Sequence, residues 1–313
     1  MTSMMALRAH ARGGAEQLVY EPAPAPVPGP GEALVAVHAA AITFAELTWD
    51  LSWTTADGRD RTPVIPAHEM SGSVAALGPG AGGFAAGDEV YGLVQFDRDG
   101  AAADYVAVPA TELAAKPRAA SHVQAATLPL AALTAWQALV DHAAVEAGER
   151  VLVHGGAGGV GVYAVQLASI LGGDVTATGR DGQGDFVRKL GATTFLVTGE
   201  GGRPDFGAAA FDVVIDTVGG AVLDTSYDLL RPGGRLVTIT APPSAERAAA
   251  LGIHAMFFVV TPDAAELTRL AELVDDGRLA SVVSQTFPVS EGRRAFESAS
   301  LPHPPGKTVL MVR

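Results

Sequence analysis

Short apolar runs alternate with longer helical segments through residues 150–260. Nearly continuous apolar runs of this length are typical of parallel strands whose two faces are both covered by helices. The pattern predicts strands at residues 150–154, 174–178, 194–197, 211–216, 235–240 and 256–260, and helices at residues 160–171, 185–190 and 221–230. Strands and helices in this order build an α/β fold around a doubly wound parallel sheet.

The first 120 residues follow a different pattern, in which glycine and proline turns separate short strands. Residues 22–31 are rich in proline and favour an extended connector. Strand-like runs follow at residues 33–40, 70–76, 89–94 and 105–108. This part of the chain is therefore predicted to form an irregular, mostly β domain.

The C-terminal part begins with a predicted helix and ends with a predicted strand. Thr261 is expected to cap the helix, and Pro262 suits its first position. One apolar face of this helix collects Leu267, Leu270, Leu273 and Val274. Because a terminal strand seldom lacks a partner, we expect residues 308–312 to pair with the N-terminal β domain. The sequence thus predicts a discontinuous domain of residues 1–122 and 261–313, and a second domain of residues 123–260.

A glycine-rich turn joins the first predicted strand of the parallel sheet to its helix. The glycines have the G-x-G-x-x-G spacing, which allows a tight turn, a close approach of the backbone to a pyrophosphate, and close packing of helix on sheet. The free N–H groups at the start of the helix favour an anion. We therefore predict a dinucleotide site that includes Gly156, Ala157, Gly158, Gly159, Val160 and Gly161.

The end of the second predicted strand indicates which nicotinamide cofactor binds. Enzymes specific for NAD place a carboxylate there for the ribose hydroxyls, whereas this chain has Thr178, Gly179 and Arg180. An arginine can bind a 2′-phosphate with charge-assisted bonds. We therefore expect NADPH, with Gly179 and Arg180 in its site. Two alternatives stay open: Arg180 is a surface residue paired with Asp181, or Asp181 faces the ribose and the preference is NADH.

Composition narrows the function further. A net charge of −13 argues against nucleic acid or an anionic membrane as partner. The chain has no cysteine, which excludes disulfides, thiolate nucleophiles and every cysteine-ligated zinc site. Residues 1–20 lack the apolar core and cleavage site of a secretory signal, so we expect a cytoplasmic enzyme.

Several short motifs are spread along the chain: PVIPAHEMSG at 63–72, GDEVYG at 87–92, ATLP at 126–129, TAW at 134–136, the glycine turn, KLGA at 189–192 and GKTVL at 306–310. With these motifs the chain resembles the medium-chain dehydrogenase/reductase superfamily, and within it the zinc-free quinone oxidoreductase branch. The resemblance covers essentially the whole chain. It implies a GroES-like β domain, a Rossmann domain, an active-site cleft between them and a homodimer.

The resemblance also implies further site residues. Positions that line the cofactor in this family correspond to Thr134, Thr217, Val218, Thr240, Phe257, Phe258, Val259 and Lys307. His68 stands where zinc alcohol dehydrogenases of the superfamily have a histidine ligand, but their cysteine partners cannot exist here. No metal is therefore expected, and a surface or hydrogen-bonded His68 is the favoured interpretation.

Candidate catalytic residues lie in the segment that opens the active-site helix of the quinone reductases. That branch usually has an Asn-x-x-x-Asp-like segment there, whereas the corresponding stretch of this chain, residues 42–47, contains Thr43 and Glu46. The two residues also fit a capping box, a structural role that can coexist with catalysis. The Thr43 hydroxyl, backbone N–H groups or a ribose hydroxyl of the cofactor are the expected donors to the substrate oxygen. Glu46, if burial raises its pKa, is expected to donate a proton. Trp49, Trp53 and Phe96 are expected either to bind a conjugated substrate or to pack in the core.

The predicted function is NADPH-dependent reduction of quinones or α,β-unsaturated carbonyls without a metal. Conjugation spreads the negative charge that hydride transfer creates, which makes these acceptors suitable where no metal polarises a carbonyl. Two alternatives stay open: a trans-2-enoyl thioester reductase, and a cofactor-binding redox sensor with little turnover.

Overall fold

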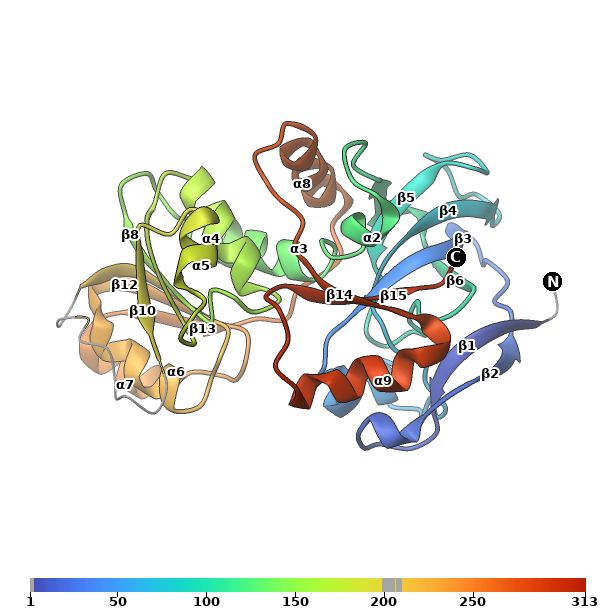
Figure 1. Cartoon of the computed structure of the whole chain (residues 1–313), viewed down its shortest axis with the longest axis horizontal. Coiled ribbons are helices and arrows are strands. Elements are labelled where there is room, and N and C mark those ends of the chain that lie inside the picture. The colour runs from blue at the N-terminus through green and yellow to red at the C-terminus, as the bar shows by residue number, and fades with distance from the viewer. Residues whose placement is uncertain (1–2, 199–205, 207–209) are drawn as a thin grey trace. The chain divides into compact units, whose positions relative to one another are not determined.

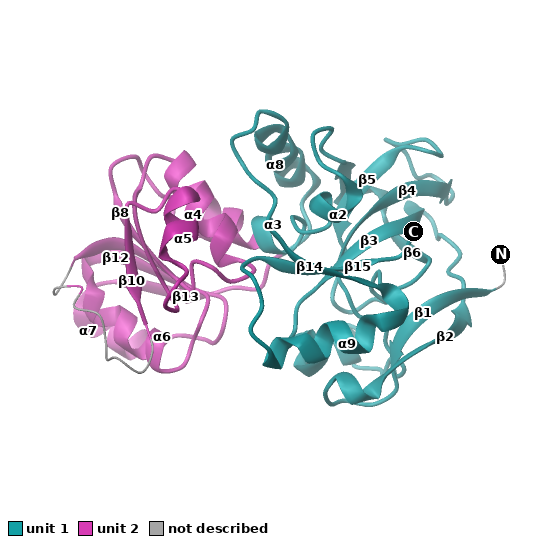
Figure 2. Ribbon diagram, in the orientation of Figure 1, with its two compact units in different colours: residues 1–133, 261–313 teal, residues 134–260 magenta. Residues whose placement is uncertain are grey.

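The computed structural model describes residues 3–198, 206 and 210–313 (Figure 1). The chain forms two compact units, one of residues 1–133 and 261–313 and one of residues 134–260 (Figure 2). The first is called unit 1 and the second unit 2. No helix within the described ranges is both long and apolar enough to cross a membrane.

Unit 2 is built on a six-stranded sheet in which every pair of neighbouring strands is parallel. The strands, in spatial order, are β10 (Thr194–Val197), β9 (Asp174–Gly179), β8 (Arg150–His154), β11 (Phe211–Asp216), β12 (Leu230–Thr238) and β13 (His254–Phe257). This 3-2-1-4-5-6 order is that of the dinucleotide-binding Rossmann fold, so the predicted doubly wound sheet is confirmed. Its strand order reverses between β8 and β11.

All six strands predicted in unit 2 are found, but two have clearly changed bounds: the sixth covers residues 254–257 instead of 256–260, and the fifth ends at Thr238 instead of Thr240. β12 begins at Leu230 rather than Arg235, because the turn Pro232–Gly234 is carried within the strand as a register shift. Leu230 pairs with Phe211, and pairing resumes at Arg235 with Val213. Gly233 permits this with a φ of +80°, which few other residues adopt.

Helices cover this sheet. They are α4 (Gly161–Ile170), α5 (Gly184–Lys189), α6 (Ala221–Ser226) followed by η5 (Tyr227–Leu229), and α7 (Ala245–Leu251). α4 is apolar almost all round and buries its residues from Gly161 to Ala168, as a helix inside a doubly wound fold must. α3 (Ala131–Trp136) continues into the π-helical η4 (Gln137–His142).

Unit 1 contains a seven-stranded, largely antiparallel sheet. Its strands run in the order β14 (Val283–Pro288), β15 (Lys307–Met311), β3 (Glu32–Ile42), β4 (Glu69–Leu77), β5 (Glu89–Leu93) and β7 (Leu113–Ala115), with β6 (Tyr105–Pro109) paired to β3. β15 is antiparallel to β3, which confirms that the C-terminal strand returns to the N-terminal domain. This pairing sets Lys307 at the end of β3 where Thr43 follows.

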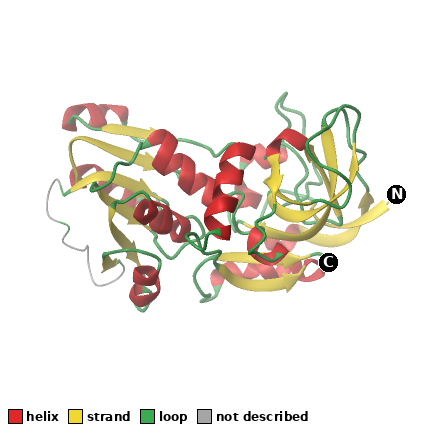
Figure 3. Cartoon of the chain, turned by 90° about the horizontal axis from the view of Figure 1, so that it is seen from above, coloured by secondary structure: helices red, strands yellow, loops and turns green. Residues whose placement is uncertain are grey.

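Shorter elements complete unit 1 (Figure 3). A separate hairpin joins β1 (Ser3–Ala9) to β2 (Leu18–Pro24). Short helices are η1 (Ala15–Gln17), η2 (Glu46–Thr48), α1 (Asp50–Trp53), η3 (Ala110–Glu112), α2 (His122–Ala125), η6 (Val289–Glu291), α9 (Gly292–Glu297) and η7 (Ser298–Ser300). The longest helix of the unit is α8 (Ala264–Asp275).

The predicted cap of α8 is wrong, although its buried face is confirmed. The helix begins at Ala264, and the carboxylate of Asp263 accepts bonds from the N–H groups of Ala265 and Glu266 at 2.8 and 2.9 Å. Thr261 lies too far upstream for this role. A carboxylate is also favoured there by the positive end of the helix dipole.

Candidate functional site

A buried ion pair lies at the centre of unit 1. Lys307, the first residue of β15, approaches Glu69, the first residue of β4, with Nζ 2.5 Å from Oε1. Their side chains are 5% and 1% exposed. The second oxygen of Glu69 accepts a bond from the N–H of Leu130 at 3.0 Å. Removing both charges from water is costly, so each partner depends strongly on the other.

The same lysine reaches Thr43, which directly follows β3. Lys307 Nζ donates a hydrogen bond to Thr43 Oγ1 at 2.9 Å. An ammonium has no lone pair and cannot accept a bond in return. The hydroxyl hydrogen of Thr43, a partly exposed residue, is therefore available to another acceptor.

Glu46 lies beside this pair and is almost fully buried, at 2% exposure. Its Oε1 accepts a bond from the N–H of Thr43 at 3.2 Å and its Oε2 one from the N–H of Ala67 at 3.0 Å. Burial raises the pKa of Glu46 from 4.5 to about 8, although the bond from Ala67 and the charge of Lys307 oppose the change. The predicted effect of burial on this carboxyl group is confirmed, and Glu46 is predominantly neutral at pH 7.

The capping box predicted for Thr43 and Glu46 is only half present. Glu46 does accept from the Thr43 N–H, but the Thr43 hydroxyl is bonded to Lys307 instead of to the N–H of Glu46. The Glu46 N–H donates to the Thr43 carbonyl at 2.9 Å. The Thr43 hydroxyl therefore does not cap the helix, because it is bonded to Lys307 of β15.

Glu46 also holds an unusual backbone turn. Ala67 has a φ of +69°, a left-handed conformation that costs a residue with a Cβ roughly 1–2 kcal/mol. Its N–H is bonded to Glu46 and its carbonyl accepts a bond from the N–H of Ala101 at 2.6 Å. The strained residue precedes His68 and Glu69, so Glu46 helps to set the direction in which both side chains leave the backbone.

His68 is neither a surface residue nor, at Nδ1, a hydrogen-bonded one. It is buried, and within the described part of the chain Nδ1 has no partner. Burial and the positive charge of Arg61 lower the pKa of His68 from 6.5 to about 4, so the ring is neutral at pH 7. Its ring contacts Phe96 edge-on, with centroids 5.2 Å apart.

The three aromatic candidates fall into two groups. Trp49 and Phe96 are partly exposed and meet edge to face at 5.3 Å, next to His68. Trp53 is 1% exposed, packs in the main hydrophobic core of unit 1 and donates from Nε1 to the Leu47 carbonyl at 2.9 Å. The packing role therefore accounts for Trp53, and only Trp49 and Phe96 present a face to a ligand.

The side chains around His68 and Glu69 do not fit a zinc ion. Both oxygens of Glu46 and of Glu69 already accept bonds or face a lysine. Among residues 3–198, 206 and 210–313, no group of three or more histidine, aspartate or glutamate side chains is arranged to hold a metal. His68 is thus left without the co-ligands that zinc requires.

The glycine turn of unit 2 has the geometry of a dinucleotide cradle. A Cβ at Gly161 would lie 2.0 Å from the Gly155 carbonyl oxygen, so only glycine allows α4 to start this close to the turn. A Cβ at Gly156 would lie 2.9 Å from that of Ala177 in β9. Gly158 has more room, since its Cβ would meet only the Gly155 oxygen, at 3.2 Å. No side chain caps α4 at Val160, and the N–H groups of Val162, Tyr163 and Ala164 are bonded to the backbone carbonyls of Gly158 and Val160. An anion at this site would therefore have to be bound by N–H groups that precede Val162.

A buried carboxylate that sequence analysis missed organises the opposite side of this site. Asp216 ends β11 and accepts bonds from the N–H groups of Val218 and Gly219 at 3.0 and 2.9 Å. Its other oxygen accepts from the hydroxyls of Thr238 and Thr240 at 2.9 and 3.3 Å. The sequence did contain a signal for this residue, because an aspartate ends the apolar run at residues 211–216.

Thr217 connects the two halves of the sheet. Its hydroxyl donates to the carbonyl of His154, the last residue of β8, at 2.7 Å. The loops after β8 and β11 therefore meet where the strand order reverses, the position at which doubly wound sheets bind ligands.

Other predicted cofactor residues lie at the same carboxyl edge. Phe257 ends β13 and is partly exposed, Val259 is exposed, and Phe258 packs on His142 at 4.4 Å. Thr134 is buried on α3. Lys307 is different, because its contacts described above all lie within unit 1.

Arg180 and Asp181 do not pair with each other among the described residues. The carboxylate of Asp181 accepts a bond from the N–H of Gly182 at 2.9 Å, within its own turn. The Arg180 N–H donates to the side chain of Gln183 at 2.8 Å, while its own side chain is exposed. Arg180 thus follows the end of β9 with an exposed side chain that is not paired to a carboxylate of the described residues.

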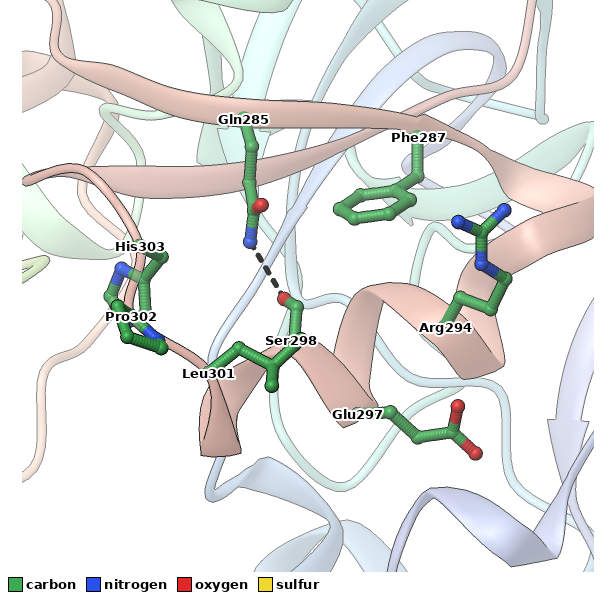
Figure 4. Close-up of a pocket in the computed structure, with 8 residues that line it drawn as sticks. All are labelled: Gln285, Phe287, Arg294, Glu297, Ser298, Leu301, Pro302 and His303. Atoms are coloured by element: carbon green, nitrogen blue, oxygen red, sulfur yellow. Dashed lines mark hydrogen bonds between the residues drawn. The ribbon is translucent and has the colours of Figure 1, made fainter.

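A small surface cavity of about 230 Å³ lies apart from these groups, on unit 1 (Figure 4). Across its floor, Gln285 of β14 donates a bond to Ser298 at 2.6 Å. Gln285 also donates to Thr308, the residue after Lys307, at 3.2 Å. The wall is completed by Phe287, Arg294, Glu297, Leu301, Pro302 and His303.

Comparison with known proteins identifies the family. Residues 29–118 match the alcohol dehydrogenase GroES-like domain, and residues 190–310 match the zinc-binding dehydrogenase domain. A probable zinc-binding oxidoreductase, mitochondrial, from Arthroderma benhamiae is 33% identical over 93% of this chain and 91% of its own length. The chain belongs to the medium-chain dehydrogenase/reductase superfamily. Its unit 1 is accordingly a GroES-like β domain, as the sequence motifs indicated.

Other superfamily members show the range of activities among its relatives. The human NAD(P)H oxidoreductase RTN4IP1, mitochondrial, is 30% identical over 90% of this chain and 82% of its own length. The spectinabilin polyketide synthase system protein NorB of Streptomyces orinoci is 35% identical over 96% of this chain, which corresponds to 14% of NorB.

Solved structures of the superfamily have the same fold. The quinone oxidoreductase from Coxiella burnetii has a TM-score of 0.90 at 30% identity and covers 99% of this chain and 100% of its own. The CurK enoyl reductase has a TM-score of 0.86 at 25% identity and covers 100% of both chains. The protein is therefore an oxidoreductase of this superfamily, and its relatives make a nicotinamide cofactor the expected one.

Proposed function

We propose that this protein is an NADPH-dependent reductase of quinones or α,β-unsaturated carbonyls that works without a metal. The observation that carries the proposal is the exposed side chain of Arg180 directly after β9, which has no ion-pair partner among the described residues, in a Rossmann sheet whose glycine turn is intact. An arginine there favours the 2′-phosphate of NADPH, and the carboxylate of Asp181 in the same turn is bonded to the N–H of Gly182. The similarity to a quinone oxidoreductase supports the class of acceptor.

The residues of unit 2 supply binding and orientation. The N–H groups at the start of α4 would hold the pyrophosphate, and the loops fixed by Asp216 and Thr217 would border the rest of the dinucleotide. When bound, reduced nicotinamide supplies the hydride. Orientation of the acceptor within about 3–3.5 Å of the reacting carbon is then the main contribution of the protein.

Charge stabilisation falls to unit 1, because its donor set does not suit a metal. The Thr43 hydroxyl, polarised by Lys307, would donate to the oxygen on which negative charge develops. Trp49 and Phe96 offer flat apolar faces to a conjugated acceptor.

The test is oxidation of NADPH and NADH by the purified protein against simple 1,4-quinones, enones and enoyl thioesters. We expect turnover with quinones or enones, a preference for NADPH, and no change after exhaustive chelation. Activity that is lost on chelation and restored by zinc would contradict the metal-free mechanism. A preference for NADH would contradict the role of Arg180.

A second candidate is reduction of trans-2-enoyl thioesters. It is favoured by the 35% identity to a segment of a polyketide synthase and by the similarity to the CurK enoyl reductase. In that case an N-acetylcysteamine enoyl thioester would be reduced with a higher kcat/KM than any quinone or simple enone of the panel.

A third candidate, a redox sensor that binds cofactor with little turnover, would give tight NADPH binding and no oxidation with any acceptor. The expected partners are a small conjugated substrate and a second copy of the chain. The homodimer and the cytoplasmic location stay predictions, for which sedimentation and cell fractionation are the direct measurements.

A further inference from the structure

We propose that Lys307 and Thr43 form a proton relay that delivers a proton from Lys307 Nζ, through the Thr43 hydroxyl, to the substrate oxygen that becomes negative. The proposal rests on the proposed function and names the donor of its proton. It follows from one chain of contacts: Glu69 Oε1 to Lys307 Nζ at 2.5 Å, and Lys307 Nζ to Thr43 Oγ1 at 2.9 Å.

The donor and acceptor roles in this chain of contacts fix the direction in which a proton can move. Glu69 can only accept, since its Oε2 faces the N–H of Leu130 and its Oε1 faces the ammonium. Lys307 can only donate, so Thr43 must accept from it. The Thr43 hydroxyl hydrogen lies on a partly exposed residue, whereas the third hydrogen of Lys307 Nζ belongs to a side chain that is only 5% exposed. The relay therefore ends in a donor, at the partly exposed residue of the three.

The neighbouring Glu46 is not placed to do this work. It is also buried, but both of its oxygens face backbone N–H groups, those of Thr43 and Ala67. Its contact with the relay is through the backbone of Thr43. Glu46 is therefore a positioning residue, which fixes where the threonine hydroxyl points.

The step balances for a conjugated carbonyl. Hydride adds to the β-carbon, the electrons of the double bond move onto the carbonyl oxygen, and that oxygen takes the proton of Thr43. Thr43 in turn takes a proton from Lys307, which is left as a neutral amine beside Glu69 and is reprotonated from water. The enol released then converts to the saturated carbonyl compound. For a quinone, the same proton goes to the oxygen of the hydroquinone that would otherwise leave as a phenolate.

Replacements at Lys307 and Thr43 test whether these residues donate a proton or only supply a positive charge. Lys307→Arg keeps the charge and the N–H groups but does not release a proton. We expect it to lower kcat by about 100-fold or more, the usual size of a lost general acid, while KM changes by less than about 3-fold. Thr43→Val removes the hydroxyl and should have a similar effect, whereas Thr43→Ser should restore most of the activity.

A binding measurement tests the site without turnover. The probe is 4-nitrophenol, whose ionised form is yellow, added to the protein saturated with NADP⁺. We expect the wild type and Lys307→Arg to favour the bound phenolate, and Thr43→Val to lose this preference. Lys307→Met combined with Glu69→Gln removes the charge without stranding the carboxylate, and it should lose the preference as well.

Lys116→Met is the matched control, because Lys116 is also a buried lysine of unit 1 and is paired with Glu89. It should keep both phenolate binding and kcat. The relay is overturned if Lys307→Arg and Thr43→Val retain kcat within about 3-fold of the wild type, since a lost general acid costs far more. If instead none of the acceptors supports oxidation of NADPH by the wild type, the proposed function fails. Phenolate binding would still report on the Thr43 and Lys307 donors in that case.

Discussion

Lys307 Nζ lies 2.9 Å from Thr43 Oγ1, although 264 positions separate the two residues in the chain. The contact exists because β15 pairs with β3, with Thr308 opposite Ile42, and β3 ends at Ile42, one residue before Thr43. The polar centre of unit 1 is therefore assembled from both ends of the chain. Its charges are held in a region from which water is nearly excluded, and this has measurable consequences.

Lys307→Met should destabilise the protein strongly. It leaves the Glu69 carboxylate buried without its cation, which typically costs about 3–5 kcal/mol. Adding Glu69→Gln should recover most of this loss, because no charge is then buried. Urea denaturation of the two variants measures the difference, and equal stabilities would show that the pair is not coupled.

Glu46 should make stability depend on pH. Its folded-state pKa of about 8 lies above the unfolded value of 4.5, so the folded state binds the extra proton between these pH values. The contribution of Glu46 to stability is fully present below pH 4.5 and is lost as the pH rises through about 8. The contribution of Glu46 to the free energy of unfolding is on the order of a few kcal/mol at low pH.

Glu46→Gln is the variant that isolates this effect. Its free energy of unfolding should change less between pH 5 and 8 than that of the wild type, as measured by urea denaturation at several pH values. Parallel curves for the two proteins would mean that Glu46 is ionised in the folded state at neutral pH.

Two glycines of the turn should respond differently to alanine. Gly161→Ala places a Cβ 2.0 Å from a backbone oxygen and should lower the melting temperature or prevent folding. Gly158→Ala meets that oxygen only at 3.2 Å and should fold, but its methyl group stands where the pyrophosphate approaches. Thermal unfolding and calorimetric titration with NADPH separate the two effects. Tight binding by Gly158→Ala would place the pyrophosphate elsewhere.

Arg180→Ala should reduce the preference for NADPH over NADH. Loss of charge-assisted bonds worth about 1.5–3 kcal/mol corresponds to roughly 10- to 100-fold in the ratio of kcat/KM values. Arg188→Ala is the matched control, since Arg188 is also exposed on unit 2 but is paired with Asp185. An unchanged ratio for Arg180→Ala would leave Arg180 as a surface residue only.

The sequence alone was sufficient for the Rossmann sheet. Strands buried on both faces must be short and apolar, and glycine must stand where helix and strand approach closely, so the runs at 150–154, 194–197 and 211–216 and the turn that ends at Gly161 are visible without the structure. The predicted cofactor site depends on these local features, so its candidate residues could be proposed from the sequence, and their contacts with a cofactor stay a prediction.

Tertiary structure decided what the sequence pattern could not show. Burial of Glu46, pairing of Lys307 with Glu69 and Thr43, and the fourfold bonding of Asp216 all depend on which strands become neighbours. A glutamate has the same local pattern whether it is solvated or buried, and α8 takes its cap from the nearest carboxylate, not from the threonine expected. Polar groups acquire their roles from desolvation and from partners far away in the chain, and only the folded sheet supplies both.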